Sequence, residues 1–163
     1  MKKSKRIVSI MLVLVTLISI LSVSVSASNY QNRDFYNFTL FDFPRFLTPR
    51  DKEDDTPCYV CVTSALINQP IYIRAHGFKI PNINDTEDVN LTRDGYGNYV
   101  PSVVIQPYQH YRIRNMIFEF EYPYASLGFR SPEELGMTNG YGNEVSGVWS
   151  PDSLGNYQYA YGE

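Results

Sequence analysis

The chain has 163 residues, of which 44% are hydrophobic, 15% aromatic and 19% charged, and its formal net charge is −3. This length suffices for one domain with a substantial core, and the aromatic content excludes a disordered chain and favours strands. The negative charge disfavours nucleic acid and anionic lipid as partners, because both repel an acidic surface.

The first 27 residues predict a secretory signal peptide. Four basic residues stand among the first six, and the run from Ile7 to Val25 that follows carries no charge. The run closes with Val25-Ser26-Ala27, which places small residues where a signal peptidase cleaves. An uncleaved anchor is the alternative, since the run is almost long enough to span a bilayer, but five Ser and Thr residues dilute it. We therefore expect cleavage before Ser28 and no membrane insertion of the mature protein.

The style of the leader indicates where the protein acts. It is rich in Lys and Ser and resembles leaders of Gram-positive bacteria, in which export leads to the cell wall or the medium. The expected location is therefore secreted, extracellular or wall-associated. Without the four basic leader residues, ten Lys and Arg remain against 17 Asp and Glu, a formal charge of −7. This charge predicts no nucleic-acid partner.

The mature chain opens with an aromatic strand and a charged loop. Loose alternation predicts a strand from Asp34 to Phe46, with Tyr36, Phe38 and Leu40 on one face. The proline-bounded segment 48–57 follows, with a cluster of carboxylates at Asp51, Glu53, Asp54 and Asp55. Such a cluster could bind calcium, but it lacks the spaced D-x-D-x-D-G pattern. A solvated loop is therefore favoured.

The two cysteines, Cys58 and Cys61, occur as Cys-Tyr-Val-Cys among residues that favour strands. In an extended strand, positions i and i+3 point to opposite faces about 10 Å apart, which is too far for a disulfide. Two packed or free thiols are favoured; a local disulfide in a turn and a redox-active or metal-binding pair are the alternatives. A zinc site would need further ligands, and the histidines, His76 and His110, are far apart in sequence.

Further strands are expected where apolar and polar residues alternate, at 58–66, 71–80, 89–93, 99–106, 111–122 and 145–149. Within 111–122 the alternating apolar residues stand at odd positions before Asn115 and at even positions after it. This switch of parity predicts a bulge or a tight bend at Asn115. One helical turn is expected over 130–136, with Ser131 as its cap. The tail, 153–163, has alternate tyrosines and is expected to be either an edge strand or disordered.

One short pattern occurs twice. Asp94-Gly95-Tyr96-Gly97-Asn98 matches Asn139-Gly140-Tyr141-Gly142-Asn143, 45 residues further on. Two hairpin turns are favoured, because Asp-Gly and Asn-Gly supply the positive φ angles that such turns require; a duplicated ligand loop is the alternative. Tyr96, Tyr141 and Trp149 are the candidate binding residues, since aromatic rings can stack on sugars or wall polymers.

The sequence shows no catalytic motif. It has no Gly-x-Ser-x-Gly elbow, no His-Glu-x-x-His, no phosphate loop and no dinucleotide fingerprint. Glu119 and Glu121 would share one strand face, but neighbours on one strand cannot flank a glycosidic bond from two sides. An exposed acidic face is favoured, and we expect no enzyme, no metal and no cofactor.

The C-terminal third resembles a known family. Ala125-Ser126-Leu127-Gly128-Phe129, a Gly/Asn-rich turn, and then Val145-Ser146-Gly147-Val148-Trp149 resemble the ending of a family of small exported Gram-positive proteins of unknown function. The resemblance implies an all-β exported domain with no established activity. The Cys pair, the charged loop at 50–56 and the Tyr-rich tail depart from the family pattern. A further likeness is to bacteriocins of the lactococcin 972 type.

Together these observations predict a signal peptide at 1–27, a sandwich at 28–152 and a tail at 153–163. The fold class is all-β: a single antiparallel β-sandwich of roughly seven to nine short strands after a cleaved N-terminal signal helix. The expected function is non-catalytic binding of an envelope component or a protein partner, at the envelope or in the medium. A bacteriocin-like toxin or its antagonist is the first alternative, and a thiol-active protein using Cys58 and Cys61 is the second.

Overall fold

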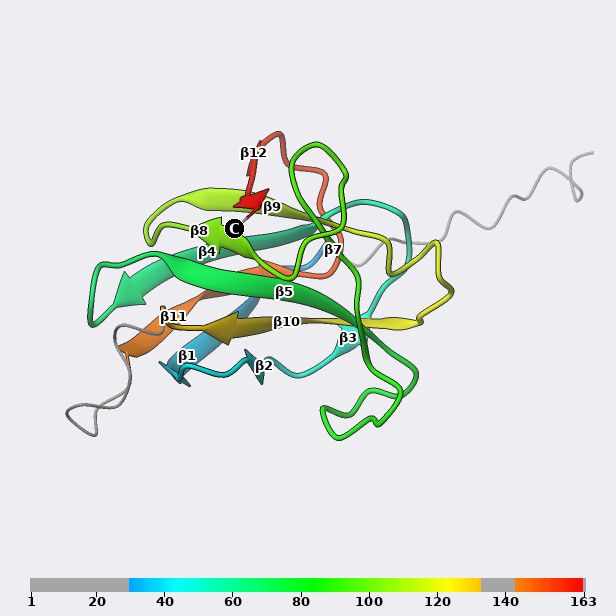
Figure 1. Ribbon diagram of the computed structural model, residues 1–163, viewed down its shortest axis with the longest axis horizontal. Coiled ribbons are helices and arrows are strands. Elements are labelled where there is room, and N and C mark those ends of the chain that lie inside the picture. Colours follow the sequence, from blue (N-terminus) through cyan, green and yellow to red (C-terminus); the bar gives the residue numbers. More distant parts are fainter. Residues whose placement is uncertain (1–29, 133–142, 163) are drawn as a thin grey trace, which may run out of the picture.

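The computed structural model describes residues 30–132 and 143–162, which form thirteen strands and no helix (Figure 1). Seven strands have three or more residues: β1 (Arg33–Leu40), β4 (Cys58–Ala65), β5 (Ile71–Phe78), β8 (Val103–Ile105), β9 (His110–Asn115), β10 (Tyr124–Arg130) and β11 (Asn143–Ser150). Six have two residues: β2 (Arg45–Phe46), β3 (Arg50–Asp51), β6 (Val89–Asn90), β7 (Thr92–Arg93), β12 (Gln158–Tyr159) and β13 (Tyr161–Gly162). The signal peptide and most of the expected helical turn lie outside the described residues. Within them, no helix is long and apolar enough to cross a membrane.

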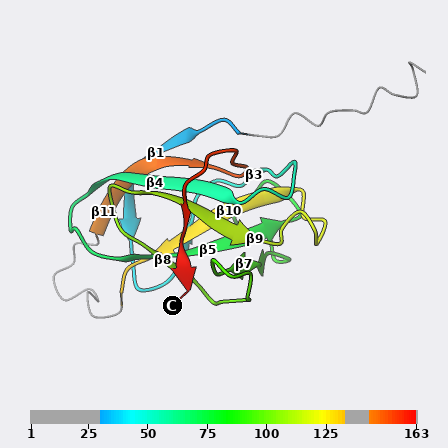
Figure 2. The same cartoon turned by 90° about the horizontal axis from the view of Figure 1, so that it is seen from above.

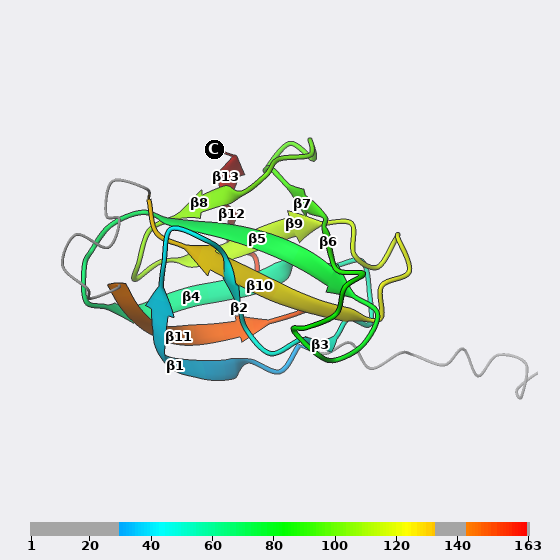
Figure 3. The same cartoon turned by 60° about the horizontal axis from the view of Figure 1, so that its bottom comes forward.

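The strands form two sheets that pack face to face. Sheet A has the order β1-β11-β4-β9-β12, with β7 also on β9; sheet B has the order β13-β8-β5-β10-β2, with β3 also on β10 and β6 on β5. Figure 3 shows β1, β11 and β4 in one layer and β5 and β10 in the other. The arrangement confirms the predicted β-sandwich. The strand number exceeds seven to nine because two-residue strands are too short for alternation to reveal them.

The core lies between the two sheets and consists of side chains at alternate strand positions. Sheet A contributes Val60, Val62, Ile113, Val145 and Trp149, and sheet B contributes Ile71, Ile73, Ala75, Leu127 and Phe129. Each fully buried aliphatic or aromatic side chain of this kind stabilises a fold by about 1.5–3 kcal/mol. The alternation that predicted β4, β5 and β11 thus reflects one face of each strand in this core.

The first expected strand, 34–46, is in fact two strands in different sheets. β1 pairs with β11 in sheet A, and β2 pairs with β10 in sheet B. The register of β1 shifts between Phe35 and Phe38, where Asn37 has a φ of 48°. This bulge turns Tyr36 to solvent while Phe35 and Leu40 are buried, so the predicted shared face of Tyr36 and Leu40 is wrong.

The expected strand over 111–122 ends at Asn115, where the chain leaves sheet A. The Asn115 amide donates to the carbonyl of Ile113 (3.2 Å), and its Oδ1 accepts the Ile117 amide (3.1 Å). Buried Ile117 then anchors a turn that leads into β10 of sheet B. The parity switch across Asn115 therefore marks a tight bend, one of the two forms predicted, and Glu119 and Glu121 lie on a turn rather than on a strand.

The sequence pattern gave no indication of β10 as a strand, although it lies inside sheet B between β5 and β2. Residues 125–129 are buried on both sides, so no polar alternation marks them. The reason is that side chains cover the outer face of sheet B. A Cβ on Gly128, which is on that face, would lie 2.5 Å from the Phe46 ring, and this ring also packs on His76 with ring centroids 4.5 Å apart.

The C-terminal segment belongs to both sheets. β12 pairs with β9 in parallel, whereas β13 pairs with β8 antiparallel, and buried Ala160 lies between them. Figure 2 shows this segment, in red, crossing the sandwich toward the C-terminus. Of the two forms expected for the tail, an edge strand or disorder, the structure shows edge strands over 158–162, because each short tyrosine strand finds a partner edge.

Gly147 offers a test of how tightly β1, β11 and β4 pack. A Cβ at Gly147 would lie 2.2 Å from the Cys61 carbonyl oxygen and 2.8 Å from the Phe35 ring. We expect Gly147→Ala to lower the free energy of unfolding by about 2–4 kcal/mol in urea titrations, since the contacting atoms are backbone and buried ring. Gly95→Ala is the matched control, because its Cβ would meet nothing closer than 3.5 Å. Equal stability of both variants would contradict this packing.

Candidate binding groove

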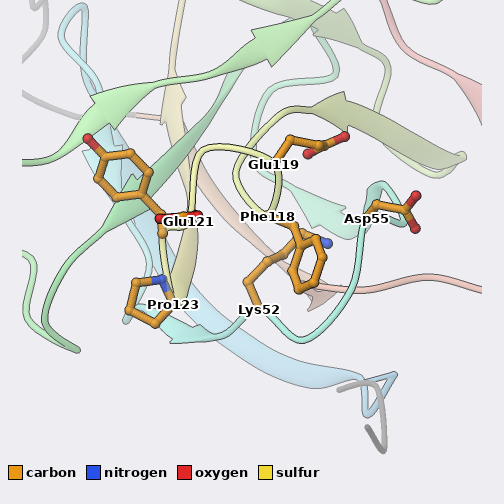
Figure 4. A pocket seen from close by; sticks show the side chains of 7 residues that line it. Lys52, Asp55, Phe118, Glu119, Glu121 and Pro123 are labelled. Carbon is orange, nitrogen blue, oxygen red and sulfur yellow. The ribbon is translucent and has the colours of Figure 1, made fainter. Parts of the chain in front are cut away.

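An open groove of about 590 Å³ lies between two segments that are distant in sequence. Lys52 and Asp55 of the charged loop form one wall, and Phe118, Glu119, Glu121, Tyr122 and Pro123 of the turn between β9 and β10 form the other (Figure 4). The lining is mostly apolar. Its volume falls in the range of ligand-binding clefts, about 300–1,000 Å³.

The turn that forms the second wall is fixed by its own backbone. The amide of Phe120 donates to the carbonyl of Met116 (3.1 Å), that of Glu121 to Phe118 (2.9 Å), and that of Tyr122 to Ile117 (3.0 Å). Glu121 has a φ of 58°, an uncommon conformation for a residue with a side chain. The turn therefore holds a defined shape rather than that of a free loop.

Two phenylalanines of this turn face solvent. Phe118 is 45% exposed and lines the groove, and Phe120 is 54% exposed. Single exposed apolar residues are common, but two on one rigid turn beside an apolar groove mark a candidate binding surface.

The first wall is held by a buried ion pair. The Lys52 ammonium donates to Asp152 Oδ1 (2.5 Å) and to the carbonyls of Asp54 (2.7 Å) and Thr56 (2.6 Å), and the side chains of Lys52 and Asp152 are fully buried. Burial raises the pKa of Asp152, an effect that the Lys52 ammonium opposes. The Lys52 ammonium is thus not available to a ligand in the groove, because its charge is paired inside the protein.

The charges left at the groove are acidic. Asp55, Glu119 and Glu121 line it, and all three are exposed. Lys79 adds one cation at the Tyr122 end, where its ammonium donates to the Glu121 carbonyl (3.3 Å) and lies 4.2 Å from the ring centroid. Among the described residues, no group of three or more His, Cys, Asp or Glu side chains could hold a metal ion.

A second hollow, of about 180 Å³, lies against the C-terminal segment. Its lining comprises Tyr30, Asn32, Tyr59, Asp152, Ser153, Leu154, Gly155 and Tyr157. The Tyr157 ring is stacked on His110 and tilted against Tyr59, with ring centroids 5.1 and 5.0 Å away, so Tyr157 already packs on rings of the protein itself. This hollow is smaller and is walled by the tail, and the larger groove is the candidate site.

Two of the three aromatic candidates, Trp149 and Tyr96, lie among the described residues, and their environments differ. Trp149 is a core residue, 2% exposed, with the Arg50 guanidinium 5.5 Å from its ring centroid, so its role is packing and it cannot stack on a ligand. Tyr96 is 85% exposed on a turn, and Tyr141 lies outside the described residues.

The first copy of the repeated pattern is the hairpin-type turn that its chemistry predicts. Asp94 Oδ1 accepts the amides of Tyr96 (2.9 Å) and Asn98 (2.8 Å). The positive φ, 94°, is at Gly97 rather than at Gly95. The second copy falls outside the described residues, apart from Asn143, which begins β11.

Both thiols of Cys58 and Cys61 are buried and unbonded. Cys58 lies in the core, and burial raises its pKa to about 12; burial also raises the pKa of Cys61. A redox-active thiol needs a lowered pKa and access, so this environment disfavours the thiol-active hypothesis.

The histidines lie in different sheets, and each has a partner. His76 Nδ1 lies 2.6 Å from Asp88 Oδ2, and burial, opposed by Asp88, lowers the pKa of His76. His110 Nδ1 lies 2.7 Å from the Tyr59 hydroxyl, and burial raises the pKa of Tyr59 to about 12. The structure does not bring the two imidazoles into one site.

Sequence reasoning treated the acidic loop and the Glu119–Glu121 segment separately, as solvated surfaces. The structure joins them across one groove, and it adds Phe118 and Tyr122, which had been assigned to a strand. The parity switch at Asn115 was the one sign in the sequence that Phe118 and Tyr122 leave the strand, because a bend at Asn115 moves every following residue off it.

The fold and the groove define a class of protein: a small β-sandwich with an apolar, acid-rimmed groove on its surface. Within that class, the chain belongs to a family of proteins of unknown function, DUF2712, whose model matches residues 23–153. The match confirms the predicted membership of an uncharacterised family and covers both walls of the groove. No curated protein and no solved structure matches the chain.

The ion pair behind the first wall can be tested by a double-mutant cycle. Lys52→Met leaves the Asp152 carboxylate buried without its cation, and we expect the free energy of unfolding to fall by about 3–5 kcal/mol. The double variant Lys52→Met, Asp152→Asn should lose less than the sum of the two single variants, because no lone charge stays buried. Additive losses in urea unfolding would show that the two groups do not interact.

The cysteine environments predict slow alkylation. In the native protein at pH 8 we expect neither thiol to react with iodoacetamide at the rate of a free cysteine, because burial raises both pKa values and blocks access. In urea both should react. Mass spectrometry of alkylated peptides distinguishes Cys58 from Cys61. Rapid native labelling of Cys61 would contradict its burial on β4 and revive the thiol-active hypothesis.

Proposed function

We propose that this chain is a secreted, non-catalytic binding protein that acts at the envelope of a Gram-positive bacterium or in the medium, and that the groove is its contact surface. The observation that carries the proposal is the pair of exposed rings, Phe118 and Phe120, on a rigid turn beside an apolar groove. The leader supports export, since its basic, apolar and small-residue parts occur in the order that signal peptidase requires.

Binding rather than catalysis is proposed because the titratable groups near the groove are poorly placed for chemistry. Asp55, Glu119 and Glu121 are exposed carboxylates, and the two histidines are engaged elsewhere. General acid–base catalysis needs a group positioned on the substrate with a pKa near the working pH. The proposed partner is an envelope component or another protein, the protein needs no cofactor, and the mature chain does not insert into membranes.

The test uses the protein secreted from the full-length gene by a Gram-positive host. We expect it in the medium or wall fraction with Ser28 as its first residue. After fluorescent labelling it should bind intact cells saturably and leave viability and membrane potential unchanged. Phe118→Ser should weaken binding at least about fivefold, which corresponds to the loss of one well-buried apolar contact.

Phe43→Ser is the matched control, because Phe43 is also about half exposed but lies between β1 and β2, stacked on Phe41. Equal effects of the two variants would remove the groove from the proposal, and Tyr96→Ser tests the aromatic candidate of the sequence in the same assay. Depolarisation or death at sub-micromolar dose would favour the bacteriocin-like alternative. Retention of the protein in the cells, or no binding at all, would contradict the proposed function for the cells used.

A further inference from the structure

We infer that the groove binds a cationic peptide segment of a protein partner, in which Lys or Arg flanks an apolar side chain. This inference rests on the proposed function and names the chemistry of the partner. It follows from the juxtaposition of Phe118 with three exposed carboxylates contributed by two walls that are 64 residues apart in sequence.

The groove carries a net negative charge. Asp55 lies on one wall and Glu119 and Glu121 on the other, whereas the Lys52 ammonium is buried on Asp152. Lys79 offsets one of the three negative charges at most. A cleft with apolar walls and charges of one sign attracts ions of the opposite sign, so an anionic ligand is disfavoured and a cationic one favoured.

Apolar side chains line the groove together with these charges. Phe118, Tyr122 and Pro123 line the groove (Figure 4), and Phe118 is more exposed than Tyr122. An apolar side chain of the partner would gain about 25 cal/mol for each Å² of apolar surface removed from water. A Lys or Arg stem fits the same surface, since it packs on apolar atoms while its cation reaches a carboxylate or the Phe118 face.

A peptide fits these features better than other cations do. No group of described residues could hold a metal ion, and the groove is much larger than one ion needs. An anionic membrane would be repelled by a mature chain of formal charge −7. A peptide can place an apolar side chain in a groove of about 590 Å³ and, from neighbouring positions, direct cations to carboxylates on both of its walls.

The test measures binding of synthetic peptides to the secreted protein by fluorescence anisotropy. One twelve-residue peptide alternates Lys with Leu and Phe; a second has Glu in place of every Lys. We expect the cationic peptide to bind saturably and more weakly as salt rises, and the acidic peptide not to bind. Binding of both peptides alike, or of neither, would overturn the inference.

Two variants of equal charge separate the groove from general acidity. Asp55→Asn, Glu119→Gln, Glu121→Gln should weaken binding of the cationic peptide at least about tenfold, because the variant removes three ion pairs with the peptide at once. The control, Asp42→Asn, Glu87→Gln, Glu144→Gln, changes three exposed carboxylates elsewhere and should change binding less than about twofold. Equal weakening by both variants would overturn the inference.

Failure of this inference and failure of the proposed function give different results. If cells bind the protein in a Phe118-dependent way but the cationic peptide does not bind, the groove takes another ligand and the inference falls alone. If the peptide binds through the three carboxylates but cells and medium offer no partner, the inference stands and the proposed location of action is wrong.

Discussion

The buried pair of Lys52 and Asp152 is the interaction on which the candidate site depends. It connects the loop after β3 to the residues that follow β11, 100 positions later, and its ammonium also binds two carbonyls of that loop. Such a pair stabilises a fold little in net terms, since desolvation offsets the attraction, but removing either partner leaves a charge buried alone. The pair therefore specifies where the loop lies more than it adds to stability.

The same pair sets how negative the groove is. If the Lys52 ammonium reached the groove, it would neutralise one of the three carboxylates there, and with Lys79 only one negative charge would be left uncompensated instead of two. Because the Lys52 ammonium is paired with Asp152 inside the protein, it does not neutralise Asp55 or Glu119 at the groove. A structural ion pair thus leaves the acidic rim free to act on a partner.

The parts of the fold that were predictable are those with one buried and one exposed face. Alternation located β4, β5 and β11, and strand geometry separated the two thiols of Cys58 and Cys61. β10 was missed because Phe46 covers the outer side of sheet B at Gly128, which erases the polar half of the pattern. The break after Leu40 was missed because aromatic residues continue through the connection to β2 in the other sheet.

The site was harder to predict because its two walls become neighbours only through long-range contacts. Each acidic segment alone looks like a solvated surface, and no local pattern shows that Lys52 finds a carboxylate 100 residues away. The turn at 117–123 also had to be recognised as a crossover between sheets, which Asn115 fixes through its two side-chain hydrogen bonds. Backbone hydrogen bonds hold both this crossover and the Tyr96 turn in defined shapes, so rigidity does not distinguish them. The difference is the surroundings, because Phe118 lines the apolar groove whereas Tyr96 lines neither of the two hollows described above, and an exposed ring beside an apolar cleft is the better candidate for a contact with a partner.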